Sequence, residues 1–311
     1  MELDDALDVI YQCDHIEILP PHLIPENSSP EKCIYEDGVL GIPQKLMQKK
    51  FASIRSLYTR LAGESHHKLS DTECKQLYKL TTLCLIVTTE NVLALNSRRR
   101  VTPASLLYKD LLFLNVLFRS PLQKHTKSPM LWNHRRWLIT QLHSVEEYQK
   151  HLTTGDFGKL STVSSHDWLN CEFLIVLKAG MLHPRNYYSW AHARWIVQEY
   201  KSSLDLNCLA EWLFVDVCSR NVSDISMWSF MEFVLDTIDN RQLSTGYVGR
   251  ALALTDLAPG HETMWTFIGN MTGKLKDKSL IDSIEEVSTI PRQGAWPSKV
   301  LQKLQVQILP N

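Results

Sequence analysis

Glycine and proline are scarce in this sequence. It has 12 glycines and 13 prolines among 311 residues, about 8% of the chain, whereas an average protein has about 12%. Sandwiches and barrels need many tight turns, so this shortage argues against those folds and against collagen. The 44% hydrophobic content excludes disorder of the whole chain. The length suits one elongated domain or two smaller ones.

An excess of charge of one sign is also absent. The chain has 33 basic and 34 acidic residues, for a net charge of -1, which gives no reason to expect nucleic acid as a partner. Its longest apolar runs, such as Leu83–Val87 and Leu111–Leu114, are far shorter than the roughly 20 residues of a bilayer span. The acidic stretch Met1–Ile10 is unlike a secretory signal. We therefore expect no membrane span and a cytoplasmic location.

Cysteine pairs of the kind that bind zinc are absent. The seven cysteines are odd in number and scattered, without a C-x-x-C motif. This pattern favours a reduced, cytoplasmic chain with no metal ligands and no cofactor of its own.

Charge is unevenly distributed along the chain. Residues 1–40 have ten acidic residues and one lysine, whereas residues 41–130 have fifteen basic and five acidic residues. Prolines are frequent in the acidic stretch, so we expect residues 1–42 to form an extended acidic arm. The arm lies across the following basic region in one interpretation and is a solvated tail in the other.

From about Pro43 the apolar residues recur at intervals of three and four, which predicts amphipathic helices. Five similar segments follow, each with one large apolar residue at the same place. Their spacings of 37, 58, 38 and 37 residues indicate a 37-residue repeat with one insertion of 21. The anchors are Leu95, Trp132, Trp190, Trp228 and Trp265.

Each anchor follows an earlier apolar helix, so the repeating unit is a helical hairpin. Stacked hairpins bury a continuous core, which predicts an all-α fold: a curved α-α superhelix, or solenoid, with five repeats over residues 43–275. The second helices are expected near 91–101, 129–142, 186–200, 224–238 and 261–274, with an inserted loop at 151–165. Residues 276–311 match no repeat and are expected to be a docking tail, an alternative end or a poorly ordered extension.

The anchor rings have a structural interpretation first. A large ring early in the second helix fills the gap between neighbouring hairpins, and Trp137 and Trp195 are placed to pack the next turn. Arg135, which stands between two of these rings, is expected to be structural as well.

Three segments carry a resemblance to a known family: PMLWNHRRWLI (129–139), RNYYSWAHARW (185–195) and GHETMW (260–265). With the repeat period, they resemble the repeats of protein prenyltransferase α-subunits over residues 70–275. The chain departs from that pattern at Leu95, Ala193, Met231 and Ile268, which indicates a divergent member.

The resemblance implies a right-handed, crescent-shaped superhelix that wraps a catalytic β-subunit, with zinc and the isoprenoid diphosphate bound by the β-subunit. This chain would then be the non-zinc α-subunit, inactive alone. The Rab-type β-subunit is the expected partner, and the expected reaction is geranylgeranyl transfer to C-terminal cysteines of cytosolic proteins. The alternative is a helical-repeat scaffold without catalytic partnership.

The same resemblance places a site at the start of the third repeat. Arg185 and Tyr187 match its lysine and tyrosine near the diphosphate and peptide, and are expected to assist catalysis. Asn186 and His192 are expected to contact substrate. Two alternatives stay open: Arg185 is a surface residue that caps a helix start, and His192 is a hydrogen-bonded structural residue. The basic run Arg98–Arg100 is expected to be a helix end that contacts carbonyls or a partner, or a solvated face.

Overall fold

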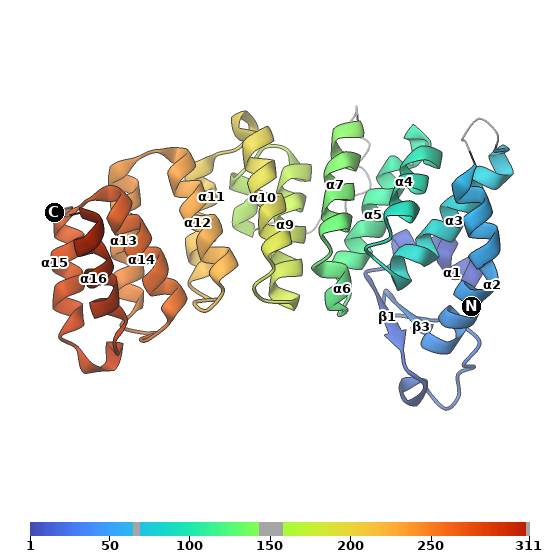
Figure 1. Cartoon of the computed structure of the whole chain (residues 1–311), viewed down its shortest axis with the longest axis horizontal. Helices are drawn as coiled ribbons and strands as arrows, with labels where there is room; N and C mark the ends of the chain where they lie inside the picture. The colour runs from blue at the N-terminus through green and yellow to red at the C-terminus, as the bar shows by residue number, and fades with distance from the viewer. Residues whose placement is uncertain (65–68, 143–157, 309–311) are drawn as a thin grey trace. The chain divides into compact units, whose positions relative to one another are not determined.

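A computed structural model of the chain describes residues 1–64, 69–142 and 158–308, and most of these residues are in α-helices (Figure 1). The predicted all-α class, built from stacked helical hairpins, is confirmed. The chain divides into two compact units: unit 1 is Met1–Gly155 with Leu174–His192, and unit 2 is Asp156–Phe173 with Ala193–Asn311.

Unit 1 begins with a small folded segment that contains three strands. Its elements are α1 (Leu3–Val9), the 3-10 helix η1 (Ile10–Gln12), β1 (His15–Leu19), the 3-10 helix η2 (Pro21–Leu23), β2 (Ile34–Glu36) and β3 (Val39–Pro43). The strand order is β1-β3-β2. Strand β3 pairs in parallel with β1 and antiparallel with β2.

The expectation of an extended arm over residues 1–42 is therefore wrong. Asp37 and Gly38 both have positive φ, 47° and 80°, and form the two-residue turn between β2 and β3, which is the usual place of an Asp-Gly pair. The acidic residues do contact the basic helices: Asp4 pairs with Lys50 at 2.6 Å and Asp8 with Lys79 at 2.8 Å.

The rest of unit 1 is built from helices. They are α2 (Gln44–Gly63), α3 (Asp71–Val87), α4 (Val92–Val101), η4 (Ala104–Leu106), α5 (Leu107–Phe118), α6 (Gln123–Thr126) and α7 (Pro129–Gln141). Helix α3 packs on α4, and α5 packs on α7. Helices α9 (Asp167–Leu182) and α10 (Tyr187–Glu199) both cross the boundary between the units.

Unit 2 continues with hairpins of the same kind. Its further elements are η5 (Gly158–Thr162), η6 (Lys201–Ser203), α11 (Leu206–Trp212), the π-helix η7 (Leu213–Cys218), α12 (Ile225–Ile238), α13 (Arg241–Leu254), α14 (Glu262–Leu275), α15 (Lys278–Ser288), η8 (Pro291–Gln293) and α16 (Trp296–Ile308). The inserted loop expected at 151–165 lies outside the described residues up to 157, and its remainder contains η5.

One local rule sets where the second helices begin. The residue four positions before the anchor is the N-cap, so the anchor comes one turn into the helix. In four copies its side chain accepts hydrogen bonds from backbone N–H groups of the first turn. The N-caps are Asn91, Ser128, Asn186 and Asp224; His261 holds this position in the fifth copy without such a bond.

All five anchors are buried, with at most 2% of their surface exposed. The Trp132 ring stacks on Phe118 with centroids 3.8 Å apart, and the Trp228 ring lies 5.0 Å from that of Phe267. Trp137 and Trp195 are half-buried. At Gly180 a Cβ would lie 3.1 Å from Trp190 Nε1, so glycine lets α9 approach this anchor closely.

A further contact repeats within each unit. In unit 1 Arg99, four residues after Leu95, donates to Asn133 Oδ1 at 3.0 Å and lies 5.3 Å from the Trp137 ring. In unit 2 Arg194, four residues after Trp190, donates to Ser229 Oγ at 2.7 Å and lies 5.7 Å from the Phe233 ring. An arginine at this position therefore joins its helix to the first and fifth positions after the next anchor.

The C-terminal segment is not a tail. Helices α15 and α16 form one more hairpin, and α16 packs on α14. Val300 and Leu304 are buried there, so the expectation of a docking tail or poorly ordered extension over residues 276–311 is corrected for the part described, up to residue 308.

No single helix in the described ranges has both the length and the apolar composition needed to cross a membrane. Helix α4 and the segment η4–α5 meet the criterion only together, across a bend of 117°.

Candidate functional site

The site predicted at the start of the third repeat lies at the turn between α9 and α10, on the part of these helices that belongs to unit 1. Asn186 is fully buried in this turn. Its Oδ1 accepts from Ser189 N at 3.2 Å, and its Nδ2 donates to Thr126 O at 2.9 Å and to Ala179 O at 3.4 Å. The structure thus gives Asn186 a structural position, as an N-cap, rather than the expected contact with substrate.

The backbone carbonyl of Thr126 connects this turn to the second repeat. It accepts both from Asn186 Nδ2 and from Trp132 Nε1, each at 2.9 Å. The turn is therefore fixed to α6 and to the buried anchor of α7.

Arg185 has an unusual backbone conformation. Its φ of 60° places it in the left-handed region, which is uncommon for residues other than glycine, asparagine and aspartate. Its carbonyl accepts from Tyr187 N at 3.1 Å. The surrounding bonds of Asn186 hold this conformation, which leaves the Arg185 residue exposed. Strain of this kind is often found at functional sites.

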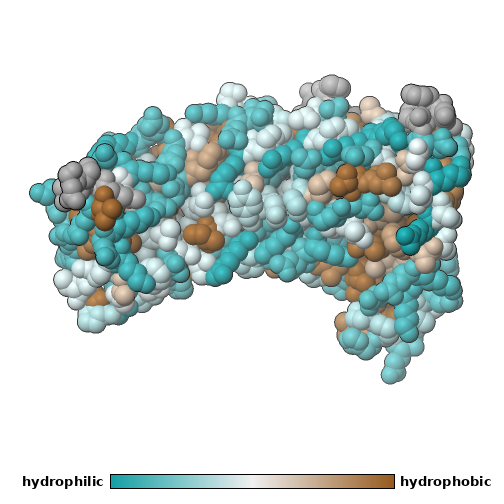
Figure 2. All heavy atoms as spheres, in the orientation of Figure 1, coloured by the Kyte–Doolittle hydropathy of each residue, from teal (hydrophilic) through white to brown (hydrophobic). Residues whose placement is uncertain are grey.

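Large apolar and aromatic side chains are exposed around the turn. Tyr187 is 66% exposed and Tyr188 38%, with their rings 5.5 Å apart and nearly perpendicular. Met181 and Leu182, at the end of α9, are also exposed. Figure 2 shows that hydrophilic residues cover most of the face in view, with only small hydrophobic patches between them. A cluster of four such side chains is the kind of surface that partners bind. We call Met181, Leu182, Tyr187 and Tyr188 the corner patch.

Cationic groups lie beside the corner patch. Lys127 Nζ donates to Pro184 O at 2.9 Å. Burial lowers the pKa of the Arg136 guanidinium, and the neighbouring Tyr187 hydroxyl opposes that effect. Burial also lowers the pKa of His183, and the Lys127 charge acts in the same direction. Lys127, Arg136 and Arg185 make the corner a cationic surface that can attract an anionic group, whereas the lowered pKa of His183 favours its neutral form.

Of the four predicted site residues, the structure brings only Arg185 and Tyr187 to the surface. His192 is fully buried, with its ring centroid 5.1 Å from that of Trp132, so the expected contact with substrate is replaced by a core position. Sequence reasoning missed the patch residues Met181, Leu182 and Tyr188. The only sequence signal was that apolar residues extend to both edges of the proline-containing turn.

A buried polar cluster lies elsewhere in unit 1. Arg98 Nε and Asp110 Oδ1 are 2.5 Å apart, and neither side chain is exposed. Arg98 Nη1 also donates to Thr81 Oγ1 and Thr82 Oγ1, at 3.1 and 2.8 Å. Burial would raise the pKa of Asp110, but the Arg98 charge and a hydrogen bond with His134 lower it overall. Asp110 is therefore ionised.

The hydrogen bonds determine the protonation state of His134. Arg99 Nε donates to His134 Nδ1 at 3.2 Å, so this nitrogen carries the lone pair and Nε2–H donates to Asp110 Oδ2 at 3.1 Å. Burial lowers the pKa of His134, while Asp110 partly opposes this. The neutral ring fits both bonds.

The basic run Arg98–Arg100 is therefore not a solvated face. Arg98 is in the core, and Arg99 contacts α7. Arg100 Nη2 donates to Ala62 O at 3.1 Å, in the last turn of α2, so the expected contact with carbonyls holds for Arg100. Arg135, equivalent to Arg98, is also fully buried and donates to Asn115 Oδ1 at 2.8 Å.

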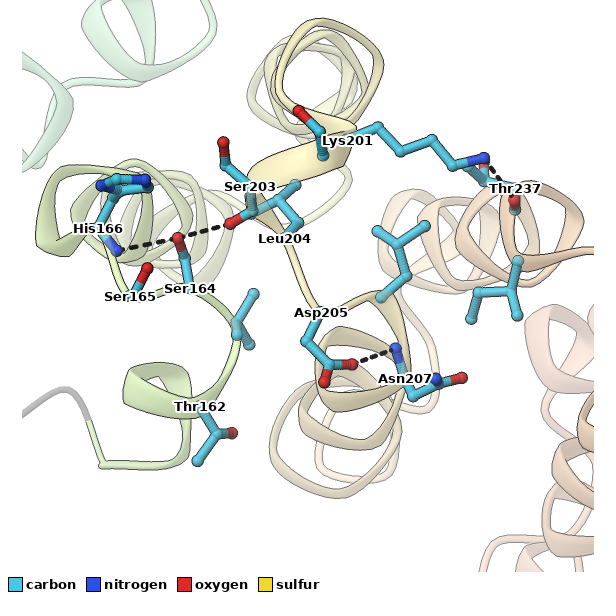
Figure 3. Close-up of a pocket in the computed structure, with 14 residues that line it drawn as sticks. Thr162, Ser164, Ser165, His166, Lys201, Ser203, Leu204, Asp205, Asn207 and Thr237 are labelled. Carbon is cyan, nitrogen blue, oxygen red and sulfur yellow. Dashed lines mark hydrogen bonds between the residues drawn. The ribbon is translucent and has the colours of Figure 1, made fainter.

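Unit 2 has a polar pocket of about 730 Å³ between the segments 162–166 and 201–207 (Figure 3). Most of the polar groups drawn there form structural bonds. Ser164 Oγ donates to Ser203 O at 2.8 Å, Lys201 Nζ donates to Thr237 O at 3.1 Å, and Asp205 Oδ1 caps α11 through Asn207 N at 2.9 Å. Backbone bonds lower the pKa of Asp205, the bond from Cys208 most. This pocket is a weaker candidate than the corner because its polar groups are already engaged.

No group of three or more His, Cys, Asp or Glu side chains in the described part of the chain is placed to hold a metal ion.

Two protein-family models match the chain. The model described as protein prenyltransferase alpha subunit repeat matches residues 117–142, which include α7 and its anchor Trp132. The model described as ECM9 middle domain matches residues 169–249, from α9 to α13.

Curated relatives carry the same repeat in their names. Protein prenyltransferase alpha subunit repeat-containing protein 1 of Homo sapiens is 28% identical over 167 residues, 52% of this chain and 40% of that protein. Its namesake 1-A of Xenopus laevis is 28% identical over 200 residues, 61% of this chain and 43% of that protein. The Danio rerio protein is 27% identical over 179 residues. The chain spans about two fifths of the length of these relatives. The predicted resemblance to prenyltransferase α-subunit repeats is confirmed.

Proposed function

We propose that this chain is the helical-repeat α-subunit of a heterodimeric protein prenyltransferase and acts with a β-subunit that binds zinc and the isoprenoid diphosphate. The reaction is geranylgeranyl transfer to C-terminal cysteines, and the Rab-type β-subunit is the partner. The repeat match and the names of the relatives support a prenyltransferase-type assembly.

The corner patch is the observation that carries the proposal. An exposed aromatic pair, two exposed aliphatic side chains and the cations Arg185 and Lys127 surround the turn between α9 and α10. Apolar contact area of this kind suits a protein partner. Cationic groups suit a leaving diphosphate, whose negative charge grows in the transition state.

Arg185 is the residue of this chain proposed to act on the reaction. Its guanidinium can bind two phosphate oxygens at once, unlike the point charge of a lysine. Asn186 fixes the turn through Thr126 O and Ala179 O. The Arg185 side chain therefore extends from a backbone of defined geometry. Tyr187 beside it would contact the peptide or the partner.

The test is co-expression with each prenyltransferase β-subunit, pull-down, and transfer of labelled isoprenoid to proteins with a C-terminal cysteine. We expect a one-to-one complex with the Rab-type β-subunit that transfers a geranylgeranyl group. The double variant Tyr187→Ala/Tyr188→Ala should lose the complex, whereas Tyr35→Ala, which removes another exposed tyrosine of unit 1, should retain it.

Arg185→Gly separates catalysis from assembly. Glycine accepts the left-handed backbone without strain, so the complex should form as before while the transfer rate falls about tenfold or more. An unchanged rate would remove Arg185 from the reaction.

The second candidate is a helical-repeat scaffold that has no catalytic partner. It is favoured by the positions where the repeats depart from the family pattern, because Ala193, Met231 and Ile268 are all buried in the core. A chain that binds none of the β-subunits would support this scaffold.

A further inference from the structure

Unit 1 has a cavity of about 1000 Å³ lined by the N-terminal segment and helices α3, α4 and α5. None of the corner-patch residues lines it. Small-molecule sites usually have volumes of about 300–1000 Å³, so this cavity is large enough for a ligand of its own.

Positive charge predominates on the cavity wall. Two acidic residues line it, Asp8 and Asp71, against five cationic residues. Asp8 is paired with Lys79, and Arg98 is paired with Asp110 behind the wall, which leaves Lys75, Arg100 and Lys109 against Asp71. The cationic residues are Lys75, Lys79, Arg98, Arg100 and Lys109. An anion in the cavity would therefore meet more attraction than repulsion.

Two of the arginines have unused donors. Arg98 is fully buried, and its Nη2 has no hydrogen-bond partner among the described residues; the same holds for the buried Nε of Arg100. Leaving a buried guanidinium donor without an acceptor is unfavourable. Both side chains line the cavity, so a ligand with several acceptor oxygens would supply what the protein does not.

The remaining wall is apolar and aromatic. Ile10, Val101 and Phe113 line the cavity and are buried. The Arg98 guanidinium lies 4.0 Å from the Tyr78 ring and 4.9 Å from the Phe113 ring. A purely inorganic anion would leave this part of the cavity without contacts.

We infer that this cavity binds a small amphipathic phosphate, in which a phosphate or diphosphate group is attached to an apolar body. Phosphate is favoured over a carboxylate because it carries more charge and more acceptor oxygens, and the wall offers several cations for one anionic group. The inference does not depend on the partnership proposed above, since all the residues involved belong to unit 1 of this chain.

Calorimetric titration of the full chain tests the ligand class. The probes are octyl phosphate below its micelle-forming concentration, pyrophosphate, and octanol. We expect saturable binding of octyl phosphate and at least about tenfold weaker binding of the other two. Equal binding of octanol would overturn the role of the cations, and equal binding of pyrophosphate would overturn the role of the apolar wall.

Charge reversal at the wall tests the location. Lys75→Glu should weaken octyl phosphate binding about tenfold or more, whereas Lys45→Glu, an exposed lysine of α2 outside the cavity, should leave it unchanged. Leu106→Trp should fill the apolar part and weaken octyl phosphate more than pyrophosphate. Circular dichroism establishes that each variant is folded. Equal effects of the two lysine variants would show general surface attraction and overturn the assignment.

Vesicles distinguish the source of the phosphate. Co-sedimentation uses phosphatidylcholine vesicles with and without phosphatidate. Retention that needs phosphatidate and is lost in Lys75→Glu supports a lipid headgroup as the ligand. Binding of octyl phosphate without vesicle retention supports a soluble ligand of the same chemistry.

Discussion

The two units fill the same repeat position with opposite chemistry. Three residues after the anchor, the copies in unit 1 have Arg98 and Arg135, whereas the later copies in unit 2 have Met231 and Ile268, and all four side chains are fully buried. The arginines bond to Asp110 and Asn115 on α5. One repeat architecture therefore tolerates either a polar or an apolar core.

The difference shows what each kind of core provides. Apolar packing stabilises many arrangements of similar volume, whereas a buried ion pair costs desolvation and is satisfied in only one geometry. The polar core occurs in the unit that carries both the corner patch and the cationic cavity. We interpret it as fixing the positions of the side chains around those sites.

Removal of Asp110 should produce the largest difference in stability between the two units. In Asp110→Ala the buried charge of Arg98 loses its partner, and we expect unit 1 to lose about 3–5 kcal/mol of stability. Hydrogen exchange measured by mass spectrometry, resolved by unit, checks this.

The matched control removes the whole pair. Arg98→Met/Asp110→Leu gives this repeat position an apolar side chain as in unit 2, and should be less destabilising than Asp110→Ala because no charge is left unpaired and only the neutral His134 Nε2–H loses its acceptor. If the double variant is as unstable as the single one, the ion pair is needed for more than charge balance.

Low pH should have the next largest effect and should destabilise unit 1 more than unit 2. His125 is fully buried and its Nε2 lies 2.9 Å from Ile86 O; burial lowers its pKa to about 4. The unfolded chain, with a pKa of about 6.5, binds the proton more readily. The stability from the neutral ring is thus complete above pH 6.5 and is lost as the pH falls toward 4, by about 3 kcal/mol.

Unit 2 offers the contrast, since its described histidines, His166 and His261, are exposed or half-buried. Amide protection should therefore fall in unit 1 first between pH 7 and pH 5. His125→Gln should flatten this dependence. Equal loss of protection in both units would contradict the assignment.

The smallest expected effect is a difference in stability between variants of two arginines at equivalent repeat positions, Arg99 in unit 1 and Arg194 in unit 2. Arg194→Ala removes surface contacts, among them those with Ser229 and the Phe233 ring, and should cost about 0.5 kcal/mol. Arg99→Ala also removes the donor to buried His134 Nδ1 and should cost about 1–2 kcal/mol. Urea denaturation of the two variants measures the difference, and equal costs would show that the His134 contact adds nothing.

The sequence predicted the elements that depend on local pattern. The 37-residue spacing and the apolar periodicity predicted the helical hairpins, because an anchor one turn into each second helix recurs at a regular interval in the sequence. The strands of residues 15–43 were missed, although the pair Asp37–Gly38 between short apolar stretches is typical of a hairpin turn. The acidic charge of this segment concealed that signal.

Features that depend on three-dimensional neighbours were not predictable. The exposure of Tyr187 and the burial of Asn186 arise from contacts with Thr126, 60 residues away. The partners of Arg98 lie on two other helices, so a run of three arginines looks like a surface feature in sequence. The cavity is formed by segments from residue 7 to residue 113, and no single motif marks it.

The fixed count between each N-cap and its anchor also determines where the chain can change length. One residue inserted between Ser128 and Trp132 would turn the ring by about 100° around the helix axis and out of the core. One residue inserted before the cap would only lengthen a loop. The 58-residue spacing between Trp132 and Trp190 shows such growth between copies. Evolution, or an engineer adding a tag or a binding loop, can therefore extend this protein between repeats without disturbing their frame.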